Sequence, residues 1–170
     1  MKKIMKVIDN YLEEEYFDSL ATLFTDKEKT GNMRMPWYFQ SSVSEHGLTE
    51  DTLFYMTHLL YEMNAPTSPL YDNLLPLLDK LEVKSLMRIK ANLYPNTEKL
   101  HEPPMHNDMS YSHSAAIFSL NTCDGYTKLK DGTKIDSVAN RVLLFDPSEE
   151  HCSTTTTNVS ARININLNYF

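Results

Sequence analysis

Glycine, which nucleotide-binding loops require, is scarce in this chain. Only four of its 170 residues are glycine, and they stand apart at Gly31, Gly47, Gly125 and Gly132. The phosphate-binding loops of Rossmann folds and P-loop proteins need several closely spaced glycines, because backbone amides must approach the phosphates. The sequence therefore argues against both classes of nucleotide-binding protein.

Cysteine and long apolar runs are also scarce. The two cysteines, Cys123 and Cys152, are too few for a disulfide framework or a four-cysteine zinc site. They are predicted to be reduced intracellular thiols. No uninterrupted apolar run exceeds four residues, which rules out a membrane span. The N-terminal segment turns acidic at residues 13–15 without the apolar stretch of a secretory signal. We therefore expect a cytoplasmic protein with no membrane partner.

Positive charge is in the minority. Sixteen Lys and Arg residues against 23 Asp and Glu residues give a formal net charge of −7. A broad surface for polyanions is not expected from such a balance, although a local basic groove would be compatible with it. Nucleic acid is therefore not an expected partner.

The length of the chain predicts one domain spanning residues 1–170. Its first part, 1–84, reads as mainly helical support. Apolar residues at helical spacing predict a helix over about 4–25, a second from Thr49 to about Met63, and a third that begins at Ser68-Pro69 and ends near Leu81.

The second part, 85–170, reads as the strand-rich core, because the apolar period changes to two. Met87, Ile89, Ala91 and Leu93 alternate with Arg88, Lys90, Asn92 and Tyr94. Near the C-terminus, Ala161, Ile163, Ile165 and Leu167 alternate with Arg162, Asn164, Asn166 and Asn168. An Asp131-Gly132 turn predicts a hairpin, and further strands fit 113–121 and 137–145. The fold class is therefore α+β.

The polar faces of the two alternating strands are unusual, because Asn, Arg and Tyr stand where an exposed face would carry Lys and Glu. Such rigid hydrogen-bonding side chains suit the polar lumen of a small barrel or sandwich. An exposed sheet face is the alternative interpretation at this point.

Two familiar catalytic patterns fail. His101 and His106 imitate a zinc-protease motif, but they lie five residues apart and enclose two prolines, which prevents the helix that the motif needs. No Gly-x-Ser-x-Gly sequence is present for a serine hydrolase.

A different motif survives. His106 and Asp108 project to the same side if they lie on an extended segment, and His151 follows a predicted strand over 140–146. Two histidines and one carboxylate form the facial triad that holds Fe(II) and leaves three positions open. Arg162, eleven residues after His151 and on the polar face of the last strand, could bind the far carboxylate of a dicarboxylate through two hydrogen bonds.

With these motifs in place, residues 86–170 resemble the iron- and 2-oxoglutarate-dependent dioxygenases, closest in style to the prolyl-hydroxylase-like branch. The resemblance rests on the stretches 88–95, 106–108, 119–121 and 140–146, on His151 and on 161–164. The tail also looks like small phage-encoded members of the superfamily, for which the location would be the host cytoplasm.

The resemblance implies a double-stranded β-helix, or jelly roll, with supporting N-terminal helices. It implies Fe(II) held by His106, Asp108 and His151, 2-oxoglutarate as co-substrate, O2, and ascorbate as an optional reductant. The 5-carboxylate of 2-oxoglutarate would be bound by Arg162 with help from Tyr94, and Asn92 and Asn164 would line the same site. This sequence departs from the family where Asn164 replaces a usual Ser or Thr, and where Ser119 replaces a frequent Tyr.

The expected activity is hydroxylation of a protein side chain, with release of succinate and CO2. A protein or peptide substrate is implied only by the branch of the family. An oxygenase acting on a small molecule or a nucleobase is a second hypothesis. A non-catalytic jelly-roll binding or structural module is a third, and it leaves the triad and Arg162 without a role.

Overall fold

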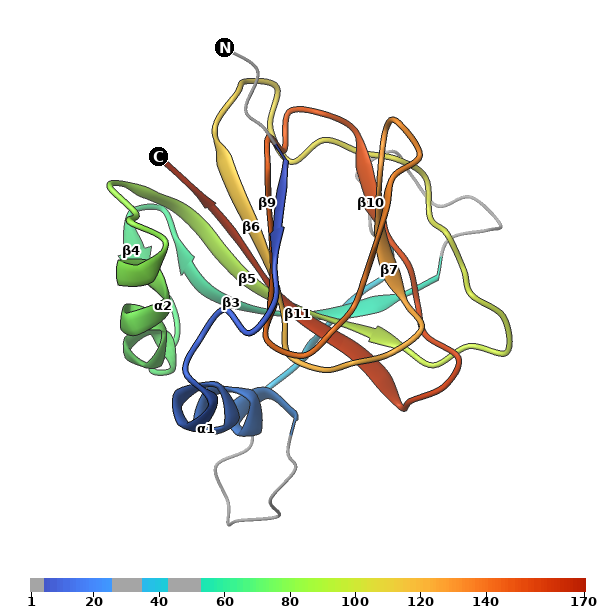
Figure 1. Ribbon diagram of the computed structural model, residues 1–170, viewed down its shortest axis with the longest axis horizontal. Coiled ribbons are helices and arrows are strands. Elements are labelled where there is room, and N and C mark those ends of the chain that lie inside the picture. Colours follow the sequence, from blue (N-terminus) through green and yellow to red (C-terminus); the bar gives the residue numbers. More distant parts are fainter. Residues whose placement is uncertain (1–4, 26–34, 43–52) are drawn as a thin grey trace.

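The computed structural model describes residues 5–25, 35–42 and 53–170. Their strands form two antiparallel sheets (Figure 1). The large sheet has the order β1-β9-β6-β11-β5-β3-β2, with β4 paired to β3, and the small sheet has the order β10-β7-β8. The strand bounds are β1 Lys6–Ile8, β2 Tyr38–Gln40, β3 Tyr55–Glu62, β4 Ala65–Pro66, β5 Leu86–Pro95, β6 Ser114–Ser119, β7 Tyr126–Leu129, β8 Lys134–Asp136, β9 Arg141–Phe145, β10 His151–Ser153 and β11 Ala161–Tyr169.

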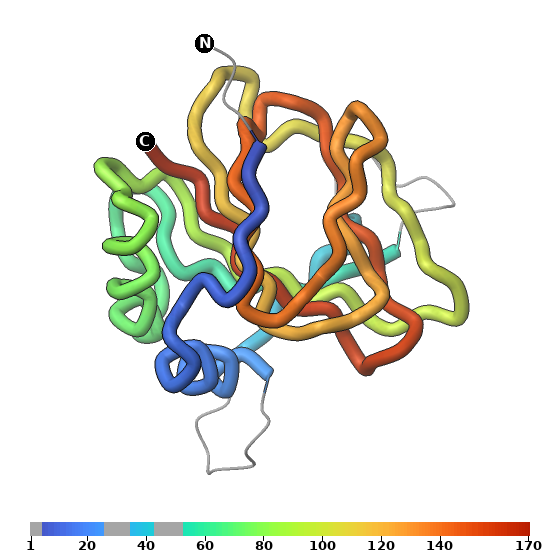
Figure 2. Tube along the Cα trace, in the orientation of Figure 1, coloured from blue at the N-terminus to red at the C-terminus, as the bar shows by residue number. Residues whose placement is uncertain are grey.

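The helices cover one face of the large sheet, while the small sheet lies on the other side (Figures 1 and 2). They are α1 (Glu14–Thr25), the 3-10 turn η1 (Tyr71–Leu74) and α2 (Leu75–Lys80). Their apolar residues join the outward face of β5 and β11 in one buried core, which includes Leu20, Phe24, Leu77, Ile89 and Ile165. None of the described helices is long and apolar enough to cross a bilayer.

A second, smaller apolar cluster joins the two sheets. Ile117 on β6 and Leu143 and Phe145 on β9 contact Ile135 on β8. The chain therefore forms a sandwich with helices outside it, and the predicted α+β jelly roll is confirmed.

Strands β5 and β11 follow the predicted alternation. Their antiparallel register places Arg162 opposite Tyr94, and Asn164 opposite Asn92. Further along, Asn166 lies opposite Lys90, and Asn168 opposite Arg88. The apolar residues between them face the helices, so all of these polar side chains share the inner face of the sheet.

Two of the helix predictions are wrong. Residues 6–8 form β1 on the edge of the large sheet, so the first helix begins only at Glu14. The segment predicted as a helix from Thr49 to Met63 contains strand β3, and residues 49–52 lie outside the described residues. Strand β3 lies between β2 and β5. Its burial does not alternate regularly and its register with β5 shifts between Leu59 and Tyr61, so it carries no clear period-two signal. The described part of 1–84 is therefore not mainly helical.

Other predictions hold. Helical structure over Tyr71–Lys80 follows Ser68-Pro69, and the Ser68 hydroxyl accepts a hydrogen bond from the backbone N–H of Leu70. The Asp-Gly hairpin joins β7 to β8, with Gly132 at a φ of 88°. Strands β6 and β9 match the predicted 113–121 and 137–145, although β9 begins later, at Arg141, because Asn140 makes a turn at a φ of 62°.

Asn140 binds the segment between β1 and α1 to the sheet. Its side-chain carbonyl accepts from the N–H of Leu12 at 2.8 Å, and its amide donates to the carbonyl of Leu12 at 2.8 Å. Its own backbone carbonyl accepts from the N–H of Tyr11 at 2.9 Å. A substitution that removes this side chain leaves a buried donor and a buried acceptor unpaired, which is expensive.

We expect Asn140→Ala to lower the free energy of unfolding by about 2–4 kcal/mol, from two lost hydrogen bonds and a backbone conformation that disfavours Ala. Asn64→Ala is the matched control, because Asn64 also has a positive φ of 61° but is exposed in the turn between β3 and β4. Urea unfolding measures both variants. Equal losses in the two would show that the Leu12 contacts contribute nothing.

Candidate metal centre

His106, Asp108 and His151 converge inside the sandwich. One ligand atom from each lies within 4.8 Å of the others. The backbone holds them there, because the N–H groups of His106 and His151 each donate to the other residue's carbonyl at 2.9 Å. The N–H of Asp108 donates to the carbonyl of Pro147 at 3.1 Å. The segment that carries His106 and Asp108 is thereby tied to the start of β10 and to the turn before it.

Contacts around His151 favour one arrangement of its ring. Its Nδ1 donates to the carbonyl of Glu149 at 3.1 Å, which leaves Nε2 with its lone pair free to bind a metal. The ring of Phe145 packs edge-on against it, with centroids 4.9 Å apart. The imidazole is thus fixed by a hydrogen bond on one side and by an aromatic ring on another.

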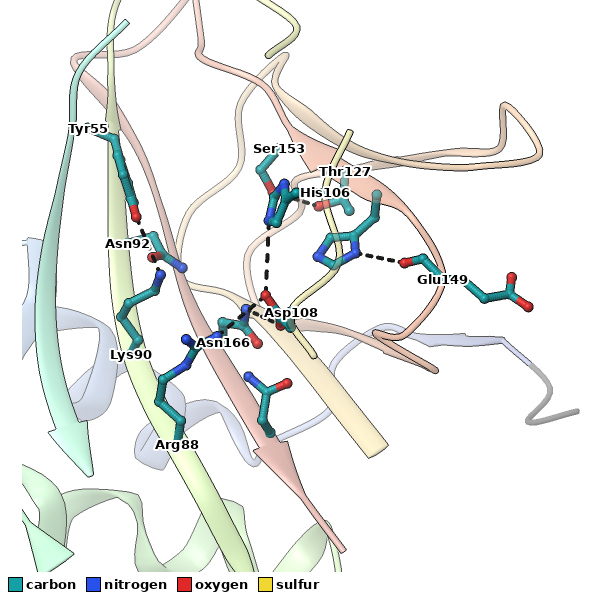
Figure 3. Close-up of polar contacts among 12 residues, drawn as sticks. Tyr55, Arg88, Lys90, Asn92, His106, Asp108, Thr127, Glu149, Ser153 and Asn166 are labelled. Atoms are coloured by element: carbon teal, nitrogen blue, oxygen red, sulfur yellow. Dashed lines mark hydrogen bonds and ion pairs between the residues drawn. The ribbon is translucent and has the colours of Figure 1, made fainter. Parts of the chain in front are cut away.

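The Asp108 carboxylate is held by two side chains that come from different strands (Figure 3). The side-chain amide of Asn166 donates to its Oδ2 at 3.1 Å, and Arg88 Nη2 lies 3.4 Å from its Oδ1. Burial raises the pKa of Asp108, but the charges of His151 and Arg88 outweigh burial and hold the pKa below its usual range. Asp108 is therefore an ionised carboxylate.

His106 is neutral in these surroundings. Burial, reinforced by the neighbouring His151, lowers the pKa of His106 to about 4. Its Nε2 lies 4.0 Å from Asp108 Oδ1. Two imidazoles and one carboxylate are the donor set of the facial triad that suits Fe(II). The residues present therefore fit the predicted metal.

The cavity at this cluster lies between the two sheets. Besides the three candidate ligands it is lined by Tyr55, Lys90, Asn92, Tyr94, Ile117, Ser153, Asn164 and Asn166. Asn92, Tyr94 and Asn164 thus lie where the sequence placed them. Burial raises the pKa of Tyr94 to about 12, so it is a neutral phenol.

Arg162 is not among the lining residues, contrary to the expectation that it would share the cavity wall. Its side chain is only 1% exposed and its guanidinium carbon lies 5.5 Å from the centre of the Tyr94 ring. The reason is that Nη1 donates to the carbonyls of Tyr126 (2.9 Å) and Thr154 (3.1 Å), and Nη2 donates to Thr127 Oγ1 (2.9 Å). These bonds hold the guanidinium next to β7.

The Arg162 guanidinium nevertheless retains an unused hydrogen-bond donor and an unpaired charge. Its Nε is buried without a hydrogen-bond partner, and no described carboxylate forms an ion pair with it. Gly125 makes room for the side chain, because a Cβ at that position would lie 2.7 Å from Arg162 Cδ and 2.5 Å from the carbonyl oxygen of Thr155. A buried cation with a free donor and no anion fits a carboxylate ligand.

Several residues of the site were not assigned to it from the sequence. Tyr55 was missed because β3 was interpreted as a helix, and Ser153 carries no signal except that it follows His151 by two residues. Lys90 and Asn166 share the polar faces of β5 and β11, so the alternation alone could have placed them. Ser119 and Asn164, the two positions at which the sequence departs from the dioxygenase pattern, are both buried.

No protein-family model matches the chain, and no curated protein sequence matches it. Solved structures do match. A prolyl hydroxylase from Trichoplax adhaerens, in complex with a hypoxia inducible factor peptide fragment, superimposes with a TM-score of 0.70 at 13% identity, over 98% of this chain and 83% of that one. A 2OG-Fe(II) family oxidoreductase from Burkholderia pseudomallei gives 0.65 at 13% identity, over 97% and 84%.

A viral structure matches as well. The collagen prolyl hydroxylase of Paramecium Bursaria Chlorella virus-1, in its 2OG complex, gives a TM-score of 0.58 at 13% identity, over 98% of this chain and 95% of that one. Identities of this size bear on the fold and not on the activity. The chain therefore has the jelly-roll fold of the prolyl hydroxylases and 2OG-Fe(II) oxygenases, as the resemblance in its sequence implied.

Proposed function

We propose that this protein is an Fe(II)- and 2-oxoglutarate-dependent oxygenase that hydroxylates a side chain of a protein or peptide, in the manner of prolyl hydroxylases. Succinate and CO2 are the expected co-products. The observation that carries the proposal is the convergence of His106, Asp108 and His151 inside a jelly roll whose solved relatives include such oxygenases.

The contacts support the following assignment of roles. His106, Asp108 and His151 hold the iron, and Arg162 with Tyr94 holds the 5-carboxylate of 2-oxoglutarate. Asn92 and Asn164 line the same cavity, where Asn92 donates to Asn164 Oδ1 at 3.0 Å. When bound, iron supplies the O2-dependent oxidation that couples decarboxylation of 2-oxoglutarate to hydroxylation.

The protein's own contribution is orientation and shielding. Asn166 and Arg88 fix the Asp108 carboxylate, and the Glu149 carbonyl fixes the His151 ring. Ile117 supplies an apolar wall of the cavity. Such supporting contacts keep ligands in place and limit the access of water to a reactive centre.

The proposal of a peptide substrate rests only on the names of two structural neighbours. The Trichoplax adhaerens neighbour binds a peptide fragment, and the viral neighbour is named a collagen prolyl hydroxylase. Substrates differ widely among proteins of one fold, so an oxygenase of small molecules remains the second hypothesis. A non-catalytic module is the third, and it leaves the buried Arg162 guanidinium without a purpose.

Turnover without the primary substrate tests the proposal. Protein loaded with Fe(II) under anaerobic conditions and then given O2 and 2-oxoglutarate should release succinate, because the uncoupled reaction needs no other substrate. The matched control is the His151→Ala variant treated identically. Release at the level of free Fe(II) in both samples would contradict the oxygenase and favour the binding module.

Metal retention tests the triad directly. We expect His106→Ala, Asp108→Ala and His151→Ala each to abolish stoichiometric iron binding, because a three-ligand site tolerates little loss. His58→Ala is the control, since His58 is a buried histidine bonded to Pro36 and Ser68 outside the cluster. Iron is measured per folded protein after gel filtration. Unchanged iron in all three triad variants would refute the assignment.

Arg162 is tested through the co-substrate. Arg162→Ala should weaken 2-oxoglutarate binding by about 2–5 kcal/mol, and Arg162→Lys should mainly raise its KM because the charge stays but the planar fork is lost. Iron affinity should barely change in either variant. Titration of 2-oxoglutarate into anaerobic Fe(II) protein, followed by the metal-to-ligand charge-transfer band, measures the affinity.

The control for Arg162 is Arg141→Ala. Arg141 binds Asp9 through Nε and Nη2 and does not line the cavity, so its loss should leave 2-oxoglutarate affinity unchanged. If Arg162→Ala binds 2-oxoglutarate as tightly as the parent protein, then another lumen cation, Arg88 or Lys90, holds the carboxylate.

A further inference from the structure

The inner face of the sheet carries more positive than negative charge. Arg88, Lys90 and Arg162 all belong to the polar faces of β5 and β11, and Asp108 is the carboxylate that lines the cavity. A bound divalent metal would add two positive charges, and a 2-oxoglutarate dianion would remove two. Within the described residues this leaves an excess of positive charge in a poorly solvated space, where unpaired charge is costly.

Lys90 is the cation that lines the cavity itself (Figure 3). Its ammonium lies 3.4 Å from the Tyr55 hydroxyl and 5.5 Å from the centre of the Tyr55 ring. None of the carboxylates in the described part of the chain forms an ion pair with it. A lysine that only supports the fold would turn its ammonium toward solvent or toward an acidic partner.

Arg88 lies two residues before Lys90 on the same face of β5. Its Nη2 contacts Asp108, but its Nε is buried without a hydrogen bond. Across the strand pair, Asn166 Oδ1 and Asn168 Nδ2 are also buried and unpaired. Buried polar atoms are normally satisfied, so three unpaired groups on the strand faces that carry Lys90 point to a polar ligand.

This group of residues is separate from Arg162, which lies next to Tyr94 but does not line the cavity. Arg162 lies opposite Tyr94, whereas Lys90 lies opposite Asn166, four residues further along β11. At about 3.3 Å per strand residue, the two positions are about 13 Å apart along the strand. Asp108 is bonded to Asn166 and Arg88 at the Lys90 end, while Arg162 is bonded to β7 and to Thr154.

We propose that Lys90, with Arg88 beside it, binds a carboxylate of the primary substrate, which therefore belongs to the class of acidic molecules. This rests on the proposed function, because it takes Arg162 as the residue that binds the co-substrate. Two kinds of substrate group could supply this carboxylate: a free α-carboxylate, or an acidic side chain within a peptide.

Calorimetric titration of protein loaded with Zn(II) and 2-oxoglutarate tests this without turnover. The probes are N-acetylglycine, which has only an α-carboxylate, and N-acetylaspartate methylamide, which has only a side-chain carboxylate. Their amides, N-acetylglycinamide and N-acetylasparagine methylamide, are the neutral counterparts. We expect one acid to bind and its amide not to bind, and the acid that binds identifies the source.

Variants then locate the binding site. Lys90→Met should weaken binding of the acid at least about tenfold, because one side of a buried charge pair is removed. Lys90→Arg should retain most of the affinity. Lys84→Met is the control, because Lys84 is exposed just before β5 and the same charge is lost. In all of these variants the affinity for 2-oxoglutarate should stay within about threefold of the parent.

The outcomes distinguish failure of this proposal from failure of the proposed oxygenase function on which it rests. If Lys90→Met weakens 2-oxoglutarate and not the acid, then Lys90 holds the co-substrate and the proposal is wrong. If the loaded protein binds neither acid, or binds acid and amide equally, the proposal is also wrong while the oxygenase assignment stands. Failure of the parent protein to bind metal and 2-oxoglutarate at all would overturn both.

Discussion

The antiparallel pairing of β5 with β11 is the constraint on which the rest of the structure depends. Apolar residues of both strands face the helices, and polar residues of both strands face the small sheet. A shift of one residue in either strand would exchange the two faces, so the core fixes the register. The same register aligns Tyr94 with Arg162 and Lys90 with Asn166. Packing outside the sheet thus determines which side chains meet inside it.

The inner face is costly for stability. Arg162, Asn164 and Asn168 are at most 1% exposed, and several of their polar atoms have no partner in the described part of the protein. An unsatisfied buried polar group costs about 1–3 kcal/mol, and replacing buried charges by apolar residues often stabilises a protein. A sequence that served only to fold would not carry this face. Ligands that satisfy these groups would recover part of the cost.

The sequence predicted those parts of the molecule in which one face of an element differs sharply from the other. The alternation in β5 and β11, and the His-x-Asp spacing with a distant histidine, led to the fold and to the cluster of His106, Asp108 and His151. Strand β3 was interpreted as a helix because its burial does not alternate regularly and its register with β5 shifts between Leu59 and Tyr61. The orientation of the Arg162 guanidinium depends on the carbonyls of Tyr126 and Thr154, and such tertiary contacts leave no trace in a local pattern.

The candidate ligands are held by little regular structure, and this affects how a metal would act on the protein. His106 forms only an isolated bridge with His151, and Asp108 lies outside any strand. Strand β10 is three residues long, and the sheet to which it belongs has three strands. The large sheet and its helices fold around an apolar core that contains none of these residues. The ligand-bearing segments can therefore move by small amounts without disturbing that core. A metal that joins 106–108 to β10 would stabilise this part of the sandwich, because the free energy of metal binding adds to that of folding when the ligands come from separate segments.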